Sequence, residues 1–582
     1  MKKQKESLSS LFSDIFLYQN NYEKYQFVIP ETDEEKSMIN NDYINDLDLQ
    51  NDNLSLDDTN ISNNFKENLT YLNVKYNTLI NSDIIIKNFD LISQNQKYSA
   101  FIIYIDGMVN SDTINTNILE PLMMRNLSNI MPNDEKVVLE NPKNNLKFKK
   151  VKKSSLLDII NLNLLPQNSV KIENNFSDII NGINSGNCAL FVDTLNKSFN
   201  IDVKGFKQRS IDTPQNEVVI RGSQEAFTEV IRTNTSLIRR LVNNENLIIE
   251  NIKVGKLSKT SCAVCYMKNI ANNSLVSEVK YRLNNLNIDY LISSGQLEQL
   301  IDDKCSSTFP QMIATERPDK TSNYILEGRV AVIINGSPYV LVMPGVFLDF
   351  LSSPEDTNLK YQFSNFLKFL RILSYLTTLL LPGLYLAITT FHIDTLPNEL
   401  LFSIVSARNE IPFPILLEVL IMSLSFELIR EAGLRVPTAI GSTIGIVGAL
   451  LIGQAAVEAK IVSPILIIII AVTGIASFTI PDFSLSFHCR IVQFIFTILG
   501  AFFGFLGIGV ALFYYLLSLT SLSSFGVPYL VPFSPITNMK GNKLFLEAPW
   551  KREYRKDFLN SKREKKQQDI SMGWKYNKYE RK

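Results

Sequence analysis

The chain has 582 residues, and its 58 basic and 58 acidic side chains cancel to a formal net charge of zero. At roughly 150 residues per domain, this length leaves room for three or four units. Because the charge is balanced, we expect no nucleic-acid partner. The cysteines indicate neither zinc nor redox chemistry, since the closest pair, Cys262 and Cys265, lies in an apolar run without a second ligand pair.

Residues 1–65 are rich in Asn, Asp and Ser, and residues 31–60 alone hold ten acidic side chains and one lysine. Such a segment cannot bury enough apolar surface to offset the entropy lost on ordering. We therefore predict that residues 1–65 are disordered. The charged start is not followed by an apolar run, so we expect no cleavable signal peptide and a cytosolic location for the head of the protein.

Residues 66–210 and 211–365 predict two α/β subdomains of similar design. The first shows a strand at 100–105, a turn at Asp106-Gly107, a helix near 111–125 and a strand at 187–193. The strand, turn and helix of 99–122 recur at 260–283, and the strand of 186–195 recurs at 328–337. This internal similarity predicts that one supersecondary unit is used twice.

Two local signals complete the second subdomain. Ser223 is the expected N-cap of a helix within 221–241. Asn335-Gly336 separates two apolar runs and predicts a hairpin with a type I′ turn, which needs positive φ at both central residues.

The last third of the chain predicts an all-α transmembrane domain over 366–535. Four uncharged apolar stretches, each long enough to cross a bilayer, lie at 372–391, 438–457, 461–480 and 491–519. The basic tail, 536–582, should be cytoplasmic like the head, so the number of crossings should be even. Four crossings satisfy this rule, and a fifth at 412–430 would not. Residues 412–430 carry two acids, so we expect a re-entrant or interfacial helix there, with a span packed inside an assembly as the alternative.

Patterns typical of catalytic sites are missing from the sequence. His392 and His488 are its only histidines, and the GxSxG, HExxH and Rossmann glycine patterns do not occur. We therefore expect no enzymatic activity, no metal and no cofactor.

Three sets of residues in the transmembrane domain are functional candidates. Gly441, Gly445, Ala449 and Gly453 recur every four residues and predict close helix packing, within one subunit or between subunits. Glu418 is a candidate membrane acid because it lacks a basic residue one helical turn away, whereas Glu427 can pair with Arg430.

The third set is a possible pore lining. Ser374, Thr377, Leu381 and Tyr385 follow one helical face, and Pro382-Gly383 should break the helix midway. A stripe of hydroxyls with an apolar constriction suits a narrow aqueous path. The alternative is that the hydroxyls bond the carbonyl oxygens of their own helix.

Several segments in order resemble the A subunit of the GerA-type spore germination receptors, of the clostridial kind. They include FPQMIATERPDKTSNYILEGRVAVIINGSPYVLVMP at 309–344, LPGLYLAITTFH at 381–392, and further runs at 209–241, 426–464 and 524–532. The resemblance implies a multi-pass protein of the spore inner membrane. It also implies a permease-like B subunit and a lipoprotein C subunit as partners, and a homo-oligomer that releases cations when germinant binds.

The resemblance and the residues together lead to two hypotheses. The first is a germinant-gated, oligomeric ion channel, and the second is a non-conducting scaffold that relays the germinant signal. A secondary transporter is disfavoured because such folds usually contain inverted repeats of several spans each, and no such repeat is visible among the four predicted spans.

Overall fold

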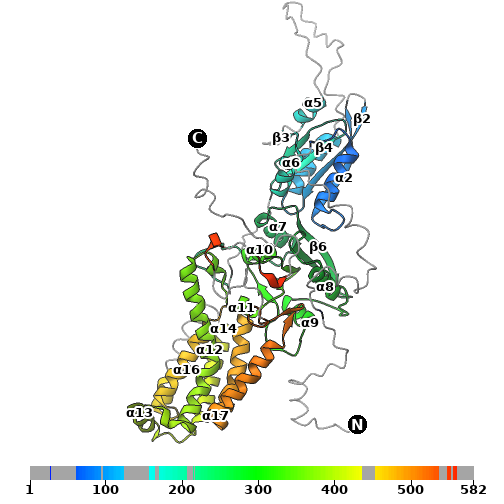
Figure 1. Cartoon of the computed structure of the whole chain (residues 1–582). Helices are drawn as coiled ribbons and strands as arrows, with labels where there is room; N and C mark the ends of the chain where they lie inside the picture. The colour runs from blue at the N-terminus through cyan, green and yellow to red at the C-terminus, as the bar shows by residue number, and fades with distance from the viewer. Residues whose placement is uncertain are drawn as a thin grey trace, which may run out of the picture.

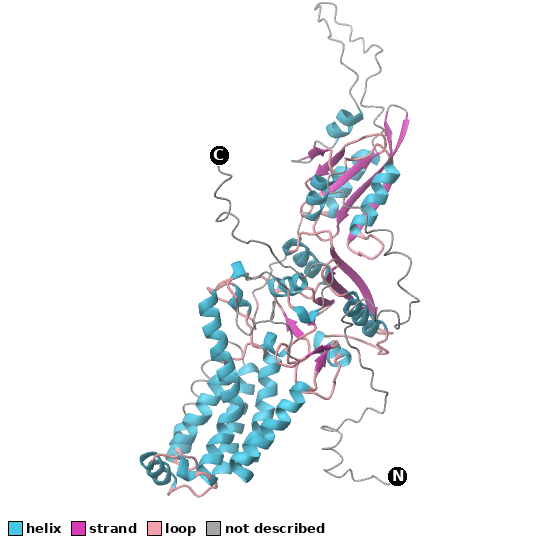
Figure 2. Ribbon diagram, viewed as in Figure 1, coloured by secondary structure: helices cyan, strands magenta, loops and turns pink. Residues whose placement is uncertain are grey.

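The computed structural model describes residues 27, 60–93, 96–123, 156–163, 170–205, 214, 217–435, 453–535, 547–551 and 555–559. Two α/β subdomains and a bundle of helices follow one another along the molecule, with the second subdomain between the other two parts (Figure 1). The strands are concentrated in the head, and the bundle consists of helices (Figure 2). Most of the segment expected to be disordered, 1–65, lies outside the described residues.

The first subdomain is an antiparallel sheet with helices on both faces. Its elements are α2 (Phe65–Tyr76), β1 (Ile84–Ser93), β2 (Gln96–Ile105), α3 (Ser111–Thr113), η2 (Ile114–Leu119), α4 (Glu120–Met123), α5 (Leu156–Asn163), β3 (Val170–Glu173), α6 (Phe176–Asn184), β4 (Cys188–Val192) and β5 (Ser198–Ile201). Side chains alternate along β2, so Phe101 and Ile103 pack beneath α2 and α6 while Ile102 packs with Ile114 of η2 on the other face.

The second subdomain repeats this sheet. Its elements are α7 (Ile231–Leu241), β6 (Leu247–Val254), β7 (Thr260–Met267), α8 (Asn273–Asn284), α9 (Ser294–Ile301), β8 (Ile313–Thr315), α10 (Pro318–Glu327), β9 (Val330–Ile334), β10 (Val340–Met343) and α11 (Phe347–Phe350). The strand orders, β1-β2-β4-β5-β3 and β6-β7-β9-β10-β8, match position for position. The predicted repeat is confirmed: β2 corresponds to β7, and β4 to β9.

A buried ion pair joins the two subdomains. Arg239 of α7 donates from Nε to Asp83 just before β1, at 2.7 Å, and both side chains are buried. Ser82 also donates its backbone N–H to Ile249 of β6 at 3.0 Å. The head therefore packs as two linked units.

Two expectations in the second subdomain were wrong in detail. The helix begins at Ile231 rather than after Ser223, because Ser223 accepts from Arg317 and the backbone N–H of Phe227 donates to Glu316, which keeps the segment extended. The β9–β10 hairpin forms, but only Gly336 has positive φ, 92°, as in a type II turn.

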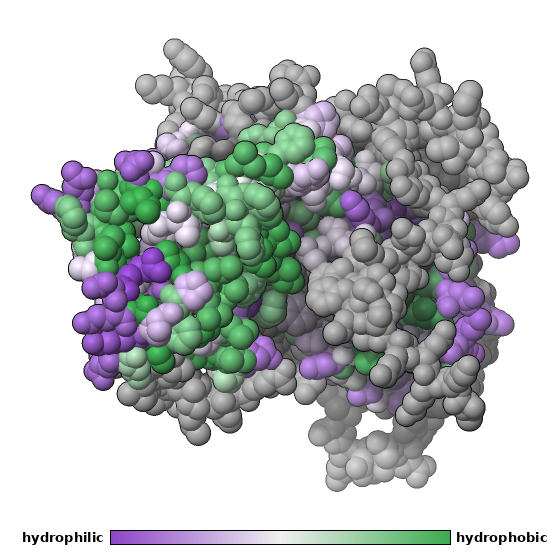
Figure 3. Space-filling model, turned by 90° about the horizontal axis from the view of Figure 1, so that it is seen from below, coloured by the Kyte–Doolittle hydropathy of each residue, from purple (hydrophilic) through white to green (hydrophobic). Residues whose placement is uncertain are grey.

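The helical domain contains α12 (Tyr361–Phe391), η5 (Ile393–Thr395), α13 (Asn398–Arg408), α14 (Ile415–Arg435), α16 (Pro464–Phe478) and α17 (Phe483–Thr520). Among the described residues, α12 and α17 are long and apolar enough to cross a membrane, and α16 is a shorter apolar helix. Seen from its far end, the bundle presents a largely apolar surface (Figure 3). The expected stretch 438–457 lies mostly outside the described residues.

The expectation of a single span at 491–519 was wrong, because α17 folds back on itself. Gly504 has φ 60° and ψ −141°, which is not helical. Nε2 of His488 lies 3.3 Å from the hydroxyl of Tyr515. In a continuous helix these residues would lie about 40 Å apart, at 1.5 Å per residue. The element is a hairpin of two helices, 483–503 and 505–520.

The break expected in the first span was also wrong, since α12 runs through Pro382 without interruption. Instead, Gly383 gives α12 a close approach to α17. A Cβ atom on Gly500 would lie 2.6 Å from the carbonyl oxygen of Gly383, and one on Gly383 would lie 2.7 Å from that of Phe496. Only glycine at both positions allows this contact.

We predict that Gly500→Ala destabilises the protein by about 1–3 kcal/mol, because the added methyl group overpacks a backbone contact. Gly509→Ala is the matched control, since a Cβ atom there meets nothing within 4 Å. Thermal unfolding of the full chain in detergent should show a lower midpoint for Gly500→Ala alone. Equal midpoints for the two variants would contradict the close approach.

Candidate functional site

A chain of hydrogen bonds crosses the junction between the head and the helices. Thr308, in the loop before β8, lies 2.7 Å from Nδ1 of His488 in the first half of α17. Nε2 of His488 lies 3.3 Å from the hydroxyl of Tyr515 in the second half, which in turn bonds the hydroxyl of Tyr375 in α12. The exposed Thr308 is thus linked to three buried side chains, those of His488, Tyr515 and Tyr375.

Aromatic packing surrounds this chain. The ring of Phe309 lies 3.7 Å from that of His488 and 5.5 Å from that of Tyr515, measured between centroids. The ring centroids of Phe347 and Tyr375 lie 5.4 Å apart. One face of the second sheet and the inner faces of α12 and α17 form a single hydrophobic core. The head therefore rests directly on the helices.

An open groove of about 440 Å³ lies beside the junction. The loop of residues 304–309 forms one wall, and both halves of α17 form the rest. Its lining includes Lys304, Thr308, His488, Val492, Tyr514 and Ser518. The groove adjoins the hydrogen-bond chain that connects the head to α17.

Glu418, the candidate membrane acid, is buried at the end of the bundle remote from the head, with 1% of its surface exposed. It accepts from the backbone N–H of Ser463 at 3.2 Å and lies 3.5 Å from Arg408 of α13. Tyr385 lies near the same groups. The structure thus brings together two residues that the sequence suggested for different roles, with Arg408 as a partner that the local pattern did not indicate.

The residues of the expected pore stripe lie in different surroundings. Tyr385 is only 8% exposed and packs among Ile415, Val419 and Leu466. Ser374, Thr377 and Leu381 are half-buried. Thr377 donates its hydroxyl to the carbonyl of Leu373 at 2.8 Å, which is the helix-internal bond considered as the alternative.

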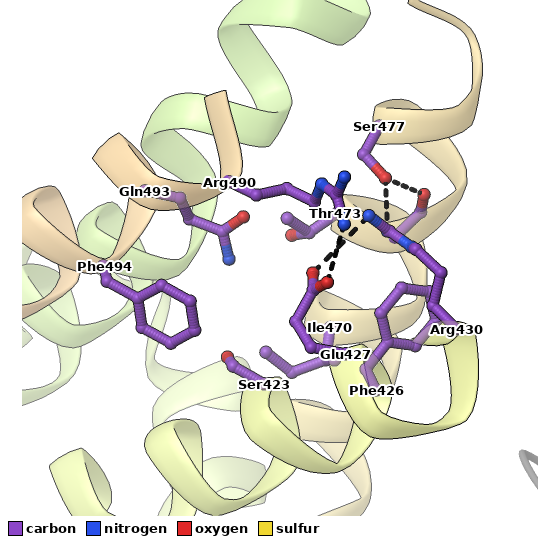
Figure 4. Close-up of a pocket in the computed structure, with 11 residues that line it drawn as sticks. Ser423, Phe426, Glu427, Arg430, Ile470, Thr473, Ser477, Arg490, Gln493 and Phe494 are labelled. Carbon is purple, nitrogen blue, oxygen red and sulfur yellow. Dashed lines mark hydrogen bonds and ion pairs between the residues drawn. The ribbon is translucent and has the colours of Figure 1, made fainter. Parts of the chain in front are cut away.

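A second charged cluster joins α14, α16 and α17. Glu427 lies 3.5 Å from Arg430, the pair expected within one helix, and 2.8 Å from Arg490 of α17. Arg430 also donates to Ser477 of α16 at 2.7 Å. The two arginine side chains reach the carboxylate of Glu427 from different helices, and their guanidinium groups lie next to each other (Figure 4). Arg490 was missed because it lies 63 residues from Glu427 in the sequence.

Of the expected glycine stripe, Gly441, Gly445 and Ala449 lie outside the described residues. At Gly453 an added Cβ would meet Ile467 at 3.9 Å, an ordinary contact. In the described bundle, Gly383 and Gly500 bring α12 and α17 together, and Gly474 of α16 lies against Phe426 of α14.

The segment 555–559 packs on the head. Lys556 lies 3.0 Å from Glu327 and 3.4 Å from Asp349, and Asp349 also pairs with Arg329 at 2.7 Å. Burial raises the pKa of the Asp349 carboxyl, but Arg329 and Lys556 outweigh it and hold this pKa below its ordinary range. The head and this part of the tail therefore lie on the same side of the helical bundle. Within the described ranges, no group of His, Cys, Asp and Glu side chains could hold a metal ion.

Comparisons with known proteins identify the family of the chain. Residues 19–558 match the family model described as Bacillus/Clostridium GerA spore germination protein. The chain is 37% identical to spore germination protein KA of Bacillus subtilis, over 84% of this chain and 85% of that protein. It is 41% identical to spore germination protein B1 of the same organism, over 60% of this chain and 72% of that protein. It is 39% identical to spore germination protein GerLA of Bacillus cereus, over 64% of this chain and 76% of that protein.

Among solved structures, the chain is similar to the N-terminal domain of the A subunit of the Bacillus megaterium spore germinant receptor GerK3. That likeness has 29% identity and a TM-score of 0.36, and it covers 50% of this chain and 98% of the other. The family model spans both subdomains and the helical bundle. The chain therefore belongs to the GerA family of spore germination proteins, as an A subunit of the germinant receptors.

Proposed function

We propose that this A subunit works in the spore inner membrane as part of a homo-oligomeric, germinant-gated cation channel. Its partners would be a permease-like B subunit and a lipoprotein C subunit. The observation that carries the proposal is the shared core at the junction, where the loop of residues 304–309 packs on both halves of α17. A displacement of the head caused by its partners would have to move these helices.

The directions of the helices support a topology with both ends cytoplasmic. Glu418 near the start of α14 and Ser463 at the start of α16 meet at the end remote from the head, and the second half of α17 returns toward the head. Lys556 of the basic tail contacts the head. We propose an even number of crossings, with α14 as a span because its two acids pair with arginines of α13 and α17.

In such an oligomer, Ser374, Thr377 and Leu381 of α12 are the proposed pore lining, with Leu381 as the apolar gate. Tyr385 belongs to the Glu418 cluster in this conformation, and it would join the lining if α12 rotated. Such a rotation would change the contacts that Tyr385 makes near Glu418, and it would therefore couple the gate to α14 and α16.

The second candidate is a scaffold that relays the germinant signal without conducting. The hydroxyl groups of Thr377 and Thr378 favour it, because both are bonded to carbonyl oxygens of α12 rather than left for ions. Conductance of the purified chain reconstituted in liposomes separates the two candidates. Ion flux supports the channel, and sealed liposomes support the relay.

We predict that Leu381→Ala causes cation release from spores in the absence of germinant, because a smaller side chain favours the wetted state of a hydrophobic gate. Leu376→Ala is the matched control, since Leu376 lies on another face of α12 and is 43% exposed. Leu380 is unsuitable as a control because it packs against the shared core. Dormant Leu381→Ala spores with a normal germinant response would contradict the gate.

We predict that Tyr515→Phe slows the germinant response, because it removes the hydroxyl group that links His488 to Tyr375. The loss of a buried hydrogen bond should also cost about 1 kcal/mol of stability. The neighbouring variant Tyr514→Phe is the control, since Tyr514 is 64% exposed. Germination curves of spores with equal amounts of receptor measure the effect. Identical curves for both variants would show that the junction takes no part in signalling.

A further inference from the structure

The pocket between α14, α16 and α17 carries an excess positive charge. Its lining includes two guanidinium groups, those of Arg430 and Arg490, and one carboxylate, that of Glu427. Both arginine side chains are only 9% exposed. An uncompensated charge in such surroundings costs several kcal/mol, so the second guanidinium needs a partner.

The protein supplies only part of this compensation. The guanidinium of Arg490 lies 3.8 Å from the ring centre of Phe487, and that of Arg430 lies 4.7 Å from that of Phe478. Cation–π contacts of this kind are weak and do not replace a counter-ion. The carboxylate of Glu427 is already shared between the two arginines.

Polar atoms inside the pocket are left without a partner. Nε of Arg430 and the hydroxyl of Ser423 are buried and find no hydrogen-bond partner among the described residues. Gln493 and Thr473 contribute further polar side chains to the lining. The side chains converge on one small space (Figure 4).

The size of that space restricts what it can hold. The space is small, since the centre of a water-sized particle can occupy only about 10 Å³ of it. A monatomic anion such as chloride is only somewhat larger than a water molecule, and it carries the charge that the pocket lacks.

We propose that this pocket binds a small monovalent inorganic anion, of the size of chloride or bromide, at Arg430 and Arg490. The bound anion completes the charge balance between three helices and accepts from the donors that the protein leaves free. It therefore stabilises the packing of α14 and α16 against α17. This inference does not depend on whether the assembly conducts ions.

The test uses the full chain in detergent, with bromide as the probe and gluconate as the large-anion control at constant ionic strength. Bromide should raise the midpoint of thermal unfolding, because an anion that binds only the folded state stabilises it. Arg430→Gln should abolish this shift. Glu427→Gln keeps both arginines but removes a competing negative charge. The bromide concentration that gives half of the maximal rise in the midpoint should therefore be about tenfold lower in this variant.

Arg408→Gln is the matched control, since Arg408 pairs with Glu418 at the other end of the bundle and should leave the bromide shift unchanged. If Arg430→Gln fails to fold, the change in bromide affinity of Glu427→Gln still tests the proposal. Equal midpoints of the unchanged protein in bromide and gluconate would overturn the proposal, as would a full bromide shift in Arg430→Gln. The pocket would then hold water only.

Discussion

The packing of Phe309 and Thr308 of the head on His488 of α17 is the contact on which the rest of the architecture depends. A ring centroid distance of 3.7 Å and a hydrogen bond of 2.7 Å place a loop of the second sheet directly against the helical hairpin. Because the same core continues into α12, a layer of water does not separate the two parts. Buried apolar contacts resist rearrangement in small steps, so such a junction transmits movement as a unit.

The helical bundle accommodates its charges in a way that follows from this geometry. The turn between α16 and α17 places Arg490 within reach of Glu427, and the loop before α14 brings Arg408 to Glu418. An unpaired charge between apolar helices is costly. Glu418 pairs with an arginine of another helix, and Glu427 pairs both with Arg430 of its own helix and with Arg490 of α17. These pairs hold α14 and α16 to their neighbours at both ends of the bundle.

Local patterns were sufficient to predict the strands β2, β4, β7, β9 and β10, the internal repeat and the apolar helices α12, α14 and α16, because each depends on residues close together in the sequence. They failed where distant residues decide the outcome. The segment after Ser223 is extended because Arg317 and Glu316 hold it, and the pairs Arg490–Glu427 and Thr308–His488 join residues separated by 63 and 180 positions. The turn at Gly504 was missed because the apolar run around it contains no polar turn residues.

A double-mutant cycle across the junction tests most directly whether the head and the helices behave as one body. Thr308→Val and Tyr375→Phe remove the two ends of the hydrogen-bond chain without touching His488 or Tyr515. If the chain acts as a unit, the two changes should be coupled by about 0.5–1 kcal/mol in the stability of the full chain. Strictly additive effects would show that the head and the helices are held together without this connection.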